Sequence, residues 1–73
     1  MNTWNEVLKA LDELDERFPE HCPFSIELFG DGSGSVRDSE DRRIASFSSY
    51  YYHVTDSDRI AAIRGITSDK LAA

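Results

Sequence analysis

The sequence contains a single cysteine and no long apolar stretch, and these two absences exclude several classes of protein. One thiol, Cys22, cannot form an internal disulfide, so the fold cannot depend on such a cross-link. No apolar run approaches the ~20 residues that a transmembrane helix needs. The first four residues, MNTW, lack a basic region followed by an apolar stretch, so we expect no signal peptide. Together these features predict a cytoplasmic protein.

Basic residues are also scarce. The chain has 14 acids against 8 bases, a net charge of −6 and a pI near 4.6. Because contacts to phosphate groups require lysine and arginine, we expect no direct binding to nucleic acid, and anionic membranes are disfavoured for the same reason.

Motifs for chemistry are missing as well. The spacing of His21, Cys22 and His53 fits no known metal site, and no orienting acid or oxyanion donor can be identified for Cys22 as a nucleophile. The glycine-rich segment 30–34 lacks the Lys-Ser/Thr pair of a phosphate-binding loop and leads into no helix. We therefore expect a protein that is not an enzyme and that carries no metal or cofactor.

Apolar residues recur at the spacing of an amphipathic helix from Trp4 to Phe18. Thr3, with Glu6 three residues later, fits a capping box, in which a hydroxyl and a carboxylate each pair with a free backbone N–H. Pro19 follows, and the helical conformation is disfavoured directly before proline, so the helix should end there. The predicted core side of this helix consists of Trp4, Val7, Leu8, Leu11, Leu14 and Phe18.

Three later segments have the pattern of β-strands. Residues 24–29 place Phe24, Ile26 and Leu28 on one face. The turn at 30–34 leads into a weaker strand over 35–38, and a turn at 39–41 leads into a longer strand over 43–53. The sequence leaves open which face of this third strand is buried: Ala45, Phe47 and Tyr51 share one face, and Ile44, Ser46, Ser48, Tyr50 and Tyr52 share the other.

A second helix should begin after Thr55, which is a good N-cap with Asp58 three residues on. Ile60 and Ile63 give this helix a core side, and Gly65 is expected to end it. Residues 68–73 would form a loose tail or a short extra turn. The predicted fold is α+β in the order α-β-β-β-α, a three-stranded antiparallel sheet packed against two helices in one domain over residues 1–73.

The negative charge is concentrated in the first helix. Residues 1–20 hold six acids and two bases, which gives −4 of the net −6. Acids three or four residues apart weaken a helix, by about 0.2–0.5 kcal/mol per pair, so this excess favours interaction with a basic partner. The alternative is a charged face that only keeps a small protein soluble. Glu6 and the four candidate partner-binding residues, Asp12, Glu13, Glu16 and Glu20, are predicted to point away from the core.

A second candidate surface is the tyrosine-rich segment 48–53. Because successive strand residues point to opposite faces, at least one of its three tyrosines should lie outside the core, and tyrosine is enriched at protein interfaces. Tyr50 and Tyr52 are therefore further candidate partner-binding residues. The hypothesis attached to them is a non-enzymatic adaptor or a homodimeric structural protein, and the alternative is that they merely cover a small sheet.

A very small acidic chain, with one acidic helix and a three-stranded sheet, resembles the small phage-encoded inhibitors of bacterial defence, the anti-CRISPR proteins and other DNA-mimic anti-restriction proteins. The resemblance covers the whole chain in size, charge and element order. It implies a stoichiometric inhibitor that occupies the basic nucleic-acid groove of a CRISPR-Cas or other nucleic-acid-handling complex in the host cytoplasm. Some inhibitors of this class block subunit assembly or nuclease activity instead. Arg42 and Arg43, in the nearly neutral C-terminal half, should pair with the acids of the preceding turn or with acids of a partner.

Overall fold

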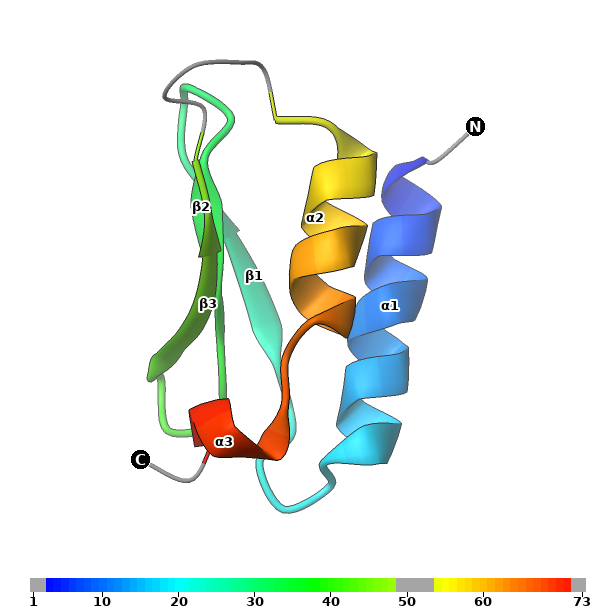
Figure 1. Ribbon diagram of the computed structural model, residues 1–73, viewed down its shortest axis with the longest axis vertical. Coiled ribbons are helices and arrows are strands. Elements are labelled where there is room, and N and C mark those ends of the chain that lie inside the picture. The colour runs from blue at the N-terminus through cyan, green and yellow to red at the C-terminus, as the bar shows by residue number, and fades with distance from the viewer. Residues whose placement is uncertain (1–2, 49–53, 72–73) are drawn as a thin grey trace.

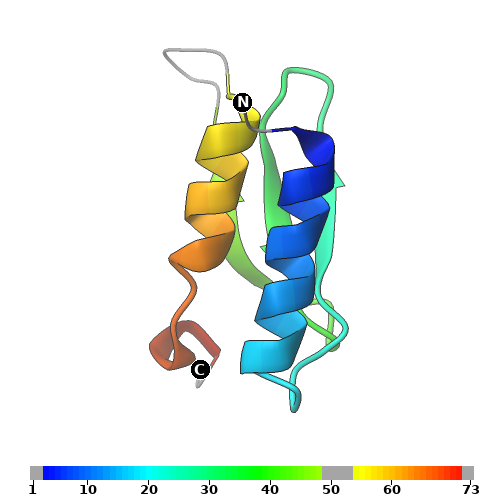
Figure 2. The ribbon, with the colours of Figure 1, turned by 90° about the vertical axis from the view of Figure 1, so that its right-hand side faces the viewer.

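The computed structural model describes residues 3–48 and 54–71 of the chain. Its sheet is antiparallel in the order β1-β2-β3, and the two longer helices lie side by side on one face of it (Figures 1 and 2). The predicted α+β fold is therefore confirmed, with α3 as a short extra turn after the second helix. The elements are α1 (Trp4–Arg17), β1 (Ser25–Leu28), β2 (Gly34–Arg37), β3 (Arg43–Phe47), α2 (Asp56–Arg64) and α3 (Ser68–Leu71).

The N-terminus of α1 differs from the prediction in its capping. Thr3 is the N-cap residue and has an extended backbone, but its side chain makes no capping hydrogen bond. The N–H of Glu6 is already taken, because it donates to the carbonyl oxygen of Thr3 at 3.0 Å. The predicted capping box of Thr3 and Glu6 is therefore wrong.

The core side of α1 is also displaced from the predicted stripe. Val7, Ala10, Leu11 and Leu14 are buried, whereas Trp4 and Leu8 are 38% and 42% exposed. Their assignment to the core was wrong because α1 packs closely along α2, and this contact buries the side of the helix that carries Ala10. The opposite edge of the apolar stripe is left in contact with solvent.

The register of the sheet decides which face of β3 is buried. Val36, at the centre of β2, is fully buried and pairs with Ile26 on one side and Ala45 on the other. The pairing of β2 with β3 then shifts between Val36 and Arg37, so that β3 has one extra residue, Ile44. This bulge allows Ile44 and Ala45, which strict alternation would place on opposite faces, both to pack on the core.

The end of β3 also differs from the prediction. The strand ends at Phe47, which is buried, and Ser48 is exposed outside it. The remainder of the predicted strand, residues 49–53, lies outside the described residues.

The start of α2 agrees with the sequence. The hydroxyl of Thr55 accepts from the N–H of Asp58 at 3.2 Å, and the Asp58 carboxylate accepts from the N–H of Thr55 at 2.8 Å, which is a complete capping box. Gly65 ends the helix in an ordinary right-handed conformation, and Ile66 beyond it is fully buried. None of the helices in the described part of the chain is long and apolar enough to cross a membrane.

Candidate protein-binding face

The exposed side of α1 carries one continuous row of side chains, which we call the α1 docking face: Trp4, Leu8, Asp12 and Glu16. These residues follow one another at intervals of four, so each lies next to its predecessor on the helix surface. At 1.5 Å of rise per residue the row extends over about 18 Å. All four are exposed. The row is apolar in its N-terminal half and acidic in its C-terminal half.

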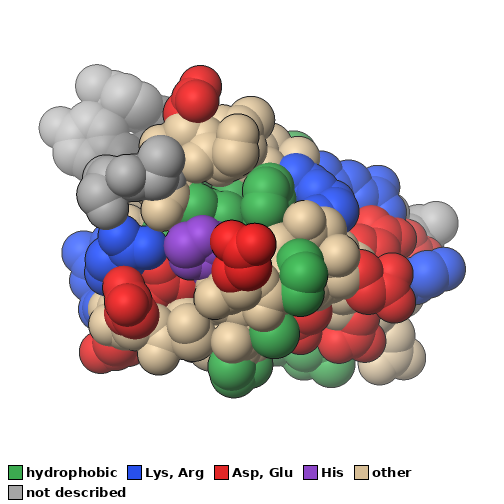
Figure 3. Space-filling model, turned by 90° about the horizontal axis from the view of Figure 1, so that it is seen from below, with side chains coloured by type: hydrophobic (Ala, Val, Ile, Leu, Met, Phe, Trp, Pro, Cys, Tyr) green, Lys and Arg blue, Asp and Glu red, His purple; other side chains and the backbone are tan. Residues whose placement is uncertain are grey.

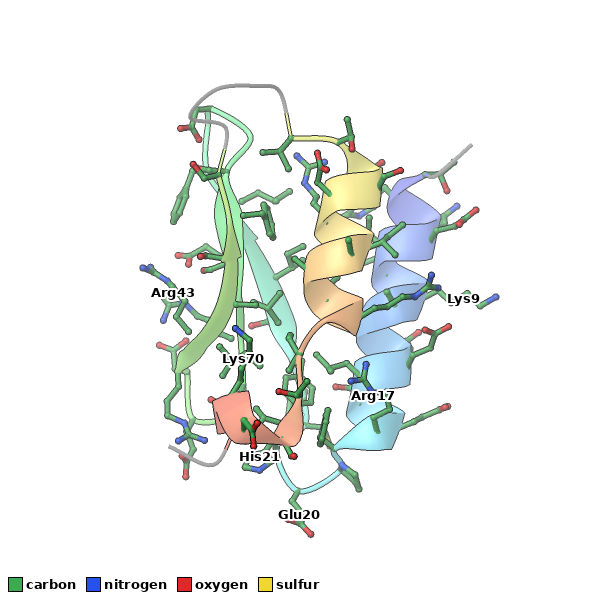
Figure 4. All side chains as sticks on the ribbon, in the orientation of Figure 1. Lys9, Arg17, Glu20, His21, Arg43 and Lys70 are labelled. Carbon is green, nitrogen blue, oxygen red and sulfur yellow. The ribbon has the colours of Figure 1, made fainter. Side chains whose placement is uncertain are left out.

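The acids of this row are unpaired in the described part of the chain. Among residues 3–48 and 54–71, neither Asp12 nor Glu16 makes an ion pair or a side-chain hydrogen bond, although Lys9 lies on the same helix. Figure 4 shows Lys9 projecting away from the body of the molecule. Seen from below, acidic side chains gather over α1 on the right of the molecule (Figure 3). The carboxylates of Asp12 and Glu16 are therefore available to an external partner.

Glu20 lies outside the helix, in the turn beyond the acidic end of the α1 docking face. It is exposed in the connection after α1 and points downward from that end of the molecule (Figure 4). It also borders a hollow of about 240 Å³ that is lined by Arg17, Phe18, His21 and residues of α3. Arg17 is held there by its donation to the carbonyl oxygen of Ile66 and by its position 5.1 Å from the centre of the Phe18 ring.

Two other predicted acids are placed differently. Glu13 lies 3.6 Å from the guanidinium of Arg64 on α2, so this carboxylate has a partner within the chain. Glu6 is exposed in the first turn of α1, where a negative charge is favoured by the helix dipole. The structure thus places Asp12 and Glu16 on the exposed side of α1, Glu13 beside Arg64 of α2, and Glu20 in the connection after the helix.

Charges elsewhere in the molecule are mostly balanced locally. On the outer face of the sheet, the Glu27 carboxylate accepts from the Ser35 hydroxyl at 2.8 Å and from Arg37 at 3.2 Å, with Arg43 at 3.7 Å. The Ser35 hydrogen bond, followed by the pairing with the arginines, keeps the pKa of Glu27 below its ordinary value despite partial burial. The three strands carry Glu27 against Arg37 and Arg43 and so have no excess of acids, and the excess lies on α1.

The turn before β3 shows the same local balance. The Arg42 guanidinium lies 2.9 Å from the Asp38 carboxylate and 3.5 Å from that of Glu40, as the sequence suggested for this arginine. Arg43 instead pairs with Glu27 across the sheet, a partner that the sequence did not indicate. Arg59 pairs with Asp56 within α2 at 2.7 Å.

Tyr50 and Tyr52, the second predicted surface, lie outside the described residues, and their role stays a prediction. Within residues 3–48 and 54–71, no three His, Cys, Asp or Glu side chains are grouped so that they could hold a metal ion. Cys22 is exposed, and its thiol donates to the carbonyl oxygen of Pro19 at 3.1 Å.

The residues that sequence reasoning missed are Trp4 and Leu8. Their spacing from Asp12 and Glu16 was visible in the sequence, but they were counted as core because they border the apolar stripe. Two more large apolar side chains, Leu28 and Phe29, are exposed where β1 ends. No protein-family model matches this sequence, and neither a curated protein nor a solved structure matches it at a significant level.

Proposed function

We propose that this protein is a non-enzymatic, protein-binding inhibitor that docks the α1 docking face and Glu20 against a basic surface of its partner. The observation that carries the proposal is the pair of exposed carboxylates, Asp12 and Glu16, without partners among the described residues, on a helix face that also exposes Trp4. The arginines of the chain, in contrast, are engaged with acids or carbonyl oxygens of the same chain. The carboxylates of Asp12 and Glu16 are therefore not neutralised by an ion pair with any described residue.

The two halves of the face would contribute differently to binding. Tryptophan is enriched among the residues that supply most of the energy of protein interfaces, so Trp4 is the expected anchor. The carboxylates would attract a basic surface from a distance and fix the orientation of the complex, an effect that salt screens. Leu8 lies between the anchor and the acids and would extend the apolar contact.

The partner that we propose is a nucleic-acid-handling complex of a bacterial defence system, whose basic groove would receive the carboxylates in place of phosphates. Small size, a net charge of −6 and the acidic first helix support this, as does the resemblance to anti-CRISPR and DNA-mimic inhibitors. The protein would then act stoichiometrically, in the cytoplasm of the host cell.

The proposal is tested by affinity capture from a bacterial lysate with matched baits. The double variant Asp12→Lys/Glu16→Lys should lose a nucleic-acid-handling complex that the wild-type chain retains. The control Glu40→Lys/Asp69→Lys makes the same change in net charge at exposed positions away from α1 and should retain it. Retention by wild type should fall with added salt and with an added duplex DNA competitor.

Trp4→Ala tests the contribution of the apolar half of the face separately from that of the acidic half. It should reduce capture at temperatures well below its melting temperature, which is measured alongside because the side chain is only 38% exposed. Capture of the same proteins by wild type and by Asp12→Lys/Glu16→Lys would show that the acidic row only keeps the protein soluble. Capture that is insensitive to duplex DNA would rule out nucleic-acid mimicry but leave protein binding in place.

A further inference from the structure

A groove of about 480 Å³ runs between β3 and the helix α2, away from the α1 docking face. Its walls are the consecutive β3 residues 43–46 on one side and Ala61, Ala62 and Gly65 of the α2 end on the other, with Lys70 of α3 at its rim. β3 is an edge strand, and among the described residues it pairs only with β2. We propose that this groove binds an extended, acidic peptide segment of a partner protein, which adds to β3 as a fourth strand.

The free edge of β3 can pair with an additional strand through its backbone. On the side away from β2, its N–H and C=O groups have no neighbouring strand in the described part of the chain, and such an edge is a template for strand addition. The strand has five residues, so at about 3.3 Å per residue it can pair with some 16 Å of extended chain. A bound segment of about five residues would fill this edge.

The side chains of α2 leave space for that segment. Ala61 and Gly65 are exposed and Ala62 is half-buried, so at these positions the helix presents no large side chain that would cover the strand edge. Ala45 and Ser46, on the β3 wall, are small as well. The incoming strand could therefore pack side chains of moderate size against α2 on one face while its other face stays in solvent.

The charge of the groove selects the occupant. Both of its charged residues, Arg43 and Lys70, are cations, in a chain whose net charge is −6. Lys70 makes no ion pair within residues 3–48 and 54–71, and in Figure 4 it points from α3 towards β3. Arg43 is about half-exposed and already has Glu27 as a partner at 3.7 Å, so Lys70 is the cation left to pair with an incoming carboxylate.

The β3 strand of a second copy of this chain would match the positive charge of the groove less well than an acidic segment would. β3 itself reads RIASF and contains no acid, so pairing of two β3 strands would bring further arginine to the edge and no carboxylate. A segment with Asp or Glu at the end beside Lys70 would bring a carboxylate to this cation. This inference does not depend on the α1 docking face, because the groove and that face share no residue.

The test uses fluorescence anisotropy with a labelled six-residue peptide, Glu-Glu-Val-Thr-Val-Thr, and the same peptide with both glutamates replaced by lysine. We expect saturable binding of the acidic peptide and none of the lysine peptide. Lys70→Glu should weaken the acidic peptide by about three- to tenfold. Lys9→Glu makes the same charge change on α1, outside the groove, and should leave the affinity within about twofold of wild type.

Two peptides N-methylated at alternate residues distinguish strand addition from simple charge attraction. In an added strand only one alternate set of N–H groups faces β3, so one methylated peptide should bind like the parent and the other should not bind. Equal loss or equal retention in both peptides would overturn strand addition. No binding of the acidic peptide at 1 mM would overturn the proposal, and concentration-dependent dimerisation without peptide binding would assign the edge to a second copy instead.

Discussion

At the scale of single residues, Asp38 is the side chain on which the turn before β3 depends. The residue is only 4% exposed, and its carboxylate accepts from the N–H groups of Glu40 and Arg42 at 3.0 and 2.9 Å and from the Arg42 guanidinium at 2.9 Å. Arg42 also donates to the carbonyl oxygen of Leu71 at 3.3 Å, which connects this turn to α3. A single buried carboxylate thus orders the turn and, through Arg42, holds the last helix.

The pKa of Asp38 leads to the first prediction. Burial acts to raise this pKa, but the hydrogen bonds from Arg42 and Glu40 and the charge of Arg42 outweigh it, so the pKa is lowered in the folded protein. The unfolded state then binds more protons as the pH falls below the ordinary value, about 3.9. The stability that Asp38 contributes is present above that pH and is lost as the pH falls through the lower, folded value.

Asp38→Asn should lower the free energy of unfolding at neutral pH by about 1–3 kcal/mol, because buried N–H donors lose a charged acceptor. It should also flatten the dependence of stability on pH below about 5, measured by urea denaturation. Glu40→Gln, at an exposed position in the same turn, is the control and should keep the wild-type dependence. An unchanged acid profile in Asp38→Asn would contradict the role assigned to this carboxylate.

At the scale of elements, the two longer helices begin with the same residue type but in different ways. Thr55 and Asp58 form a complete capping box at α2, whereas the Thr3 side chain makes no capping bond at α1. The capping pattern in the sequence therefore predicted both the position and the side-chain hydrogen bonds of the α2 start, but only the position of the α1 start. The difference arises because the backbone carbonyl of Thr3 already accepts the N–H of Glu6.

Substitution of the two threonines should separate these cases. Thr55→Ala should destabilise the protein by about 0.5–2 kcal/mol, since the N–H of Asp58 loses its acceptor. Thr3→Ala should change the free energy of unfolding by less than about 0.5 kcal/mol. Chemical denaturation of both variants measures this, and an equal cost at the two positions would mean that Thr3 caps α1 in solution after all.

At the scale of the whole molecule, charge is balanced on the sheet and unbalanced on α1. Asp12 and Glu16 stand four residues apart with no cation between them on that side, an arrangement that costs helix stability. Exposed residues that lower the stability of the fold are expected where they are required for binding to a partner. Stability and partner binding should therefore change in opposite directions at these acids.

Glu16→Lys tests this relation directly. It creates a favourable pair with Asp12 and places a cation in the last turn of α1, so stability should rise by about 0.3–0.5 kcal/mol, or about 1–4 °C in melting temperature at low salt. Glu13→Lys is the control, because it removes the pair with Arg64 and should not stabilise. If Glu16→Lys lowered the melting temperature, the carboxylate of Glu16 would stabilise the fold, contrary to its exposed and unpaired position.

The sequence determined by itself the features that depend on neighbours along the chain. The periodic apolar residues of α1, the alternation in β1, the Thr55 cap and the proline after α1 predicted the elements and their order, because each acts within a few residues. The concentration of acids in the first helix was likewise readable, since charge follows directly from composition.

Only the tertiary structure decided which side of each element is buried. The packing of α1 along α2 left Trp4 and Leu8 in solvent and gave Glu13 a partner in Arg64, and a bulge at Ile44 set the buried residues of β3. These outcomes depend on contacts between segments far apart in the chain. The helical period in the sequence locates the apolar stripe of a helix, but it does not say which edge of that stripe is buried. The neighbouring helix decides this, because it covers one edge and leaves the other in solvent.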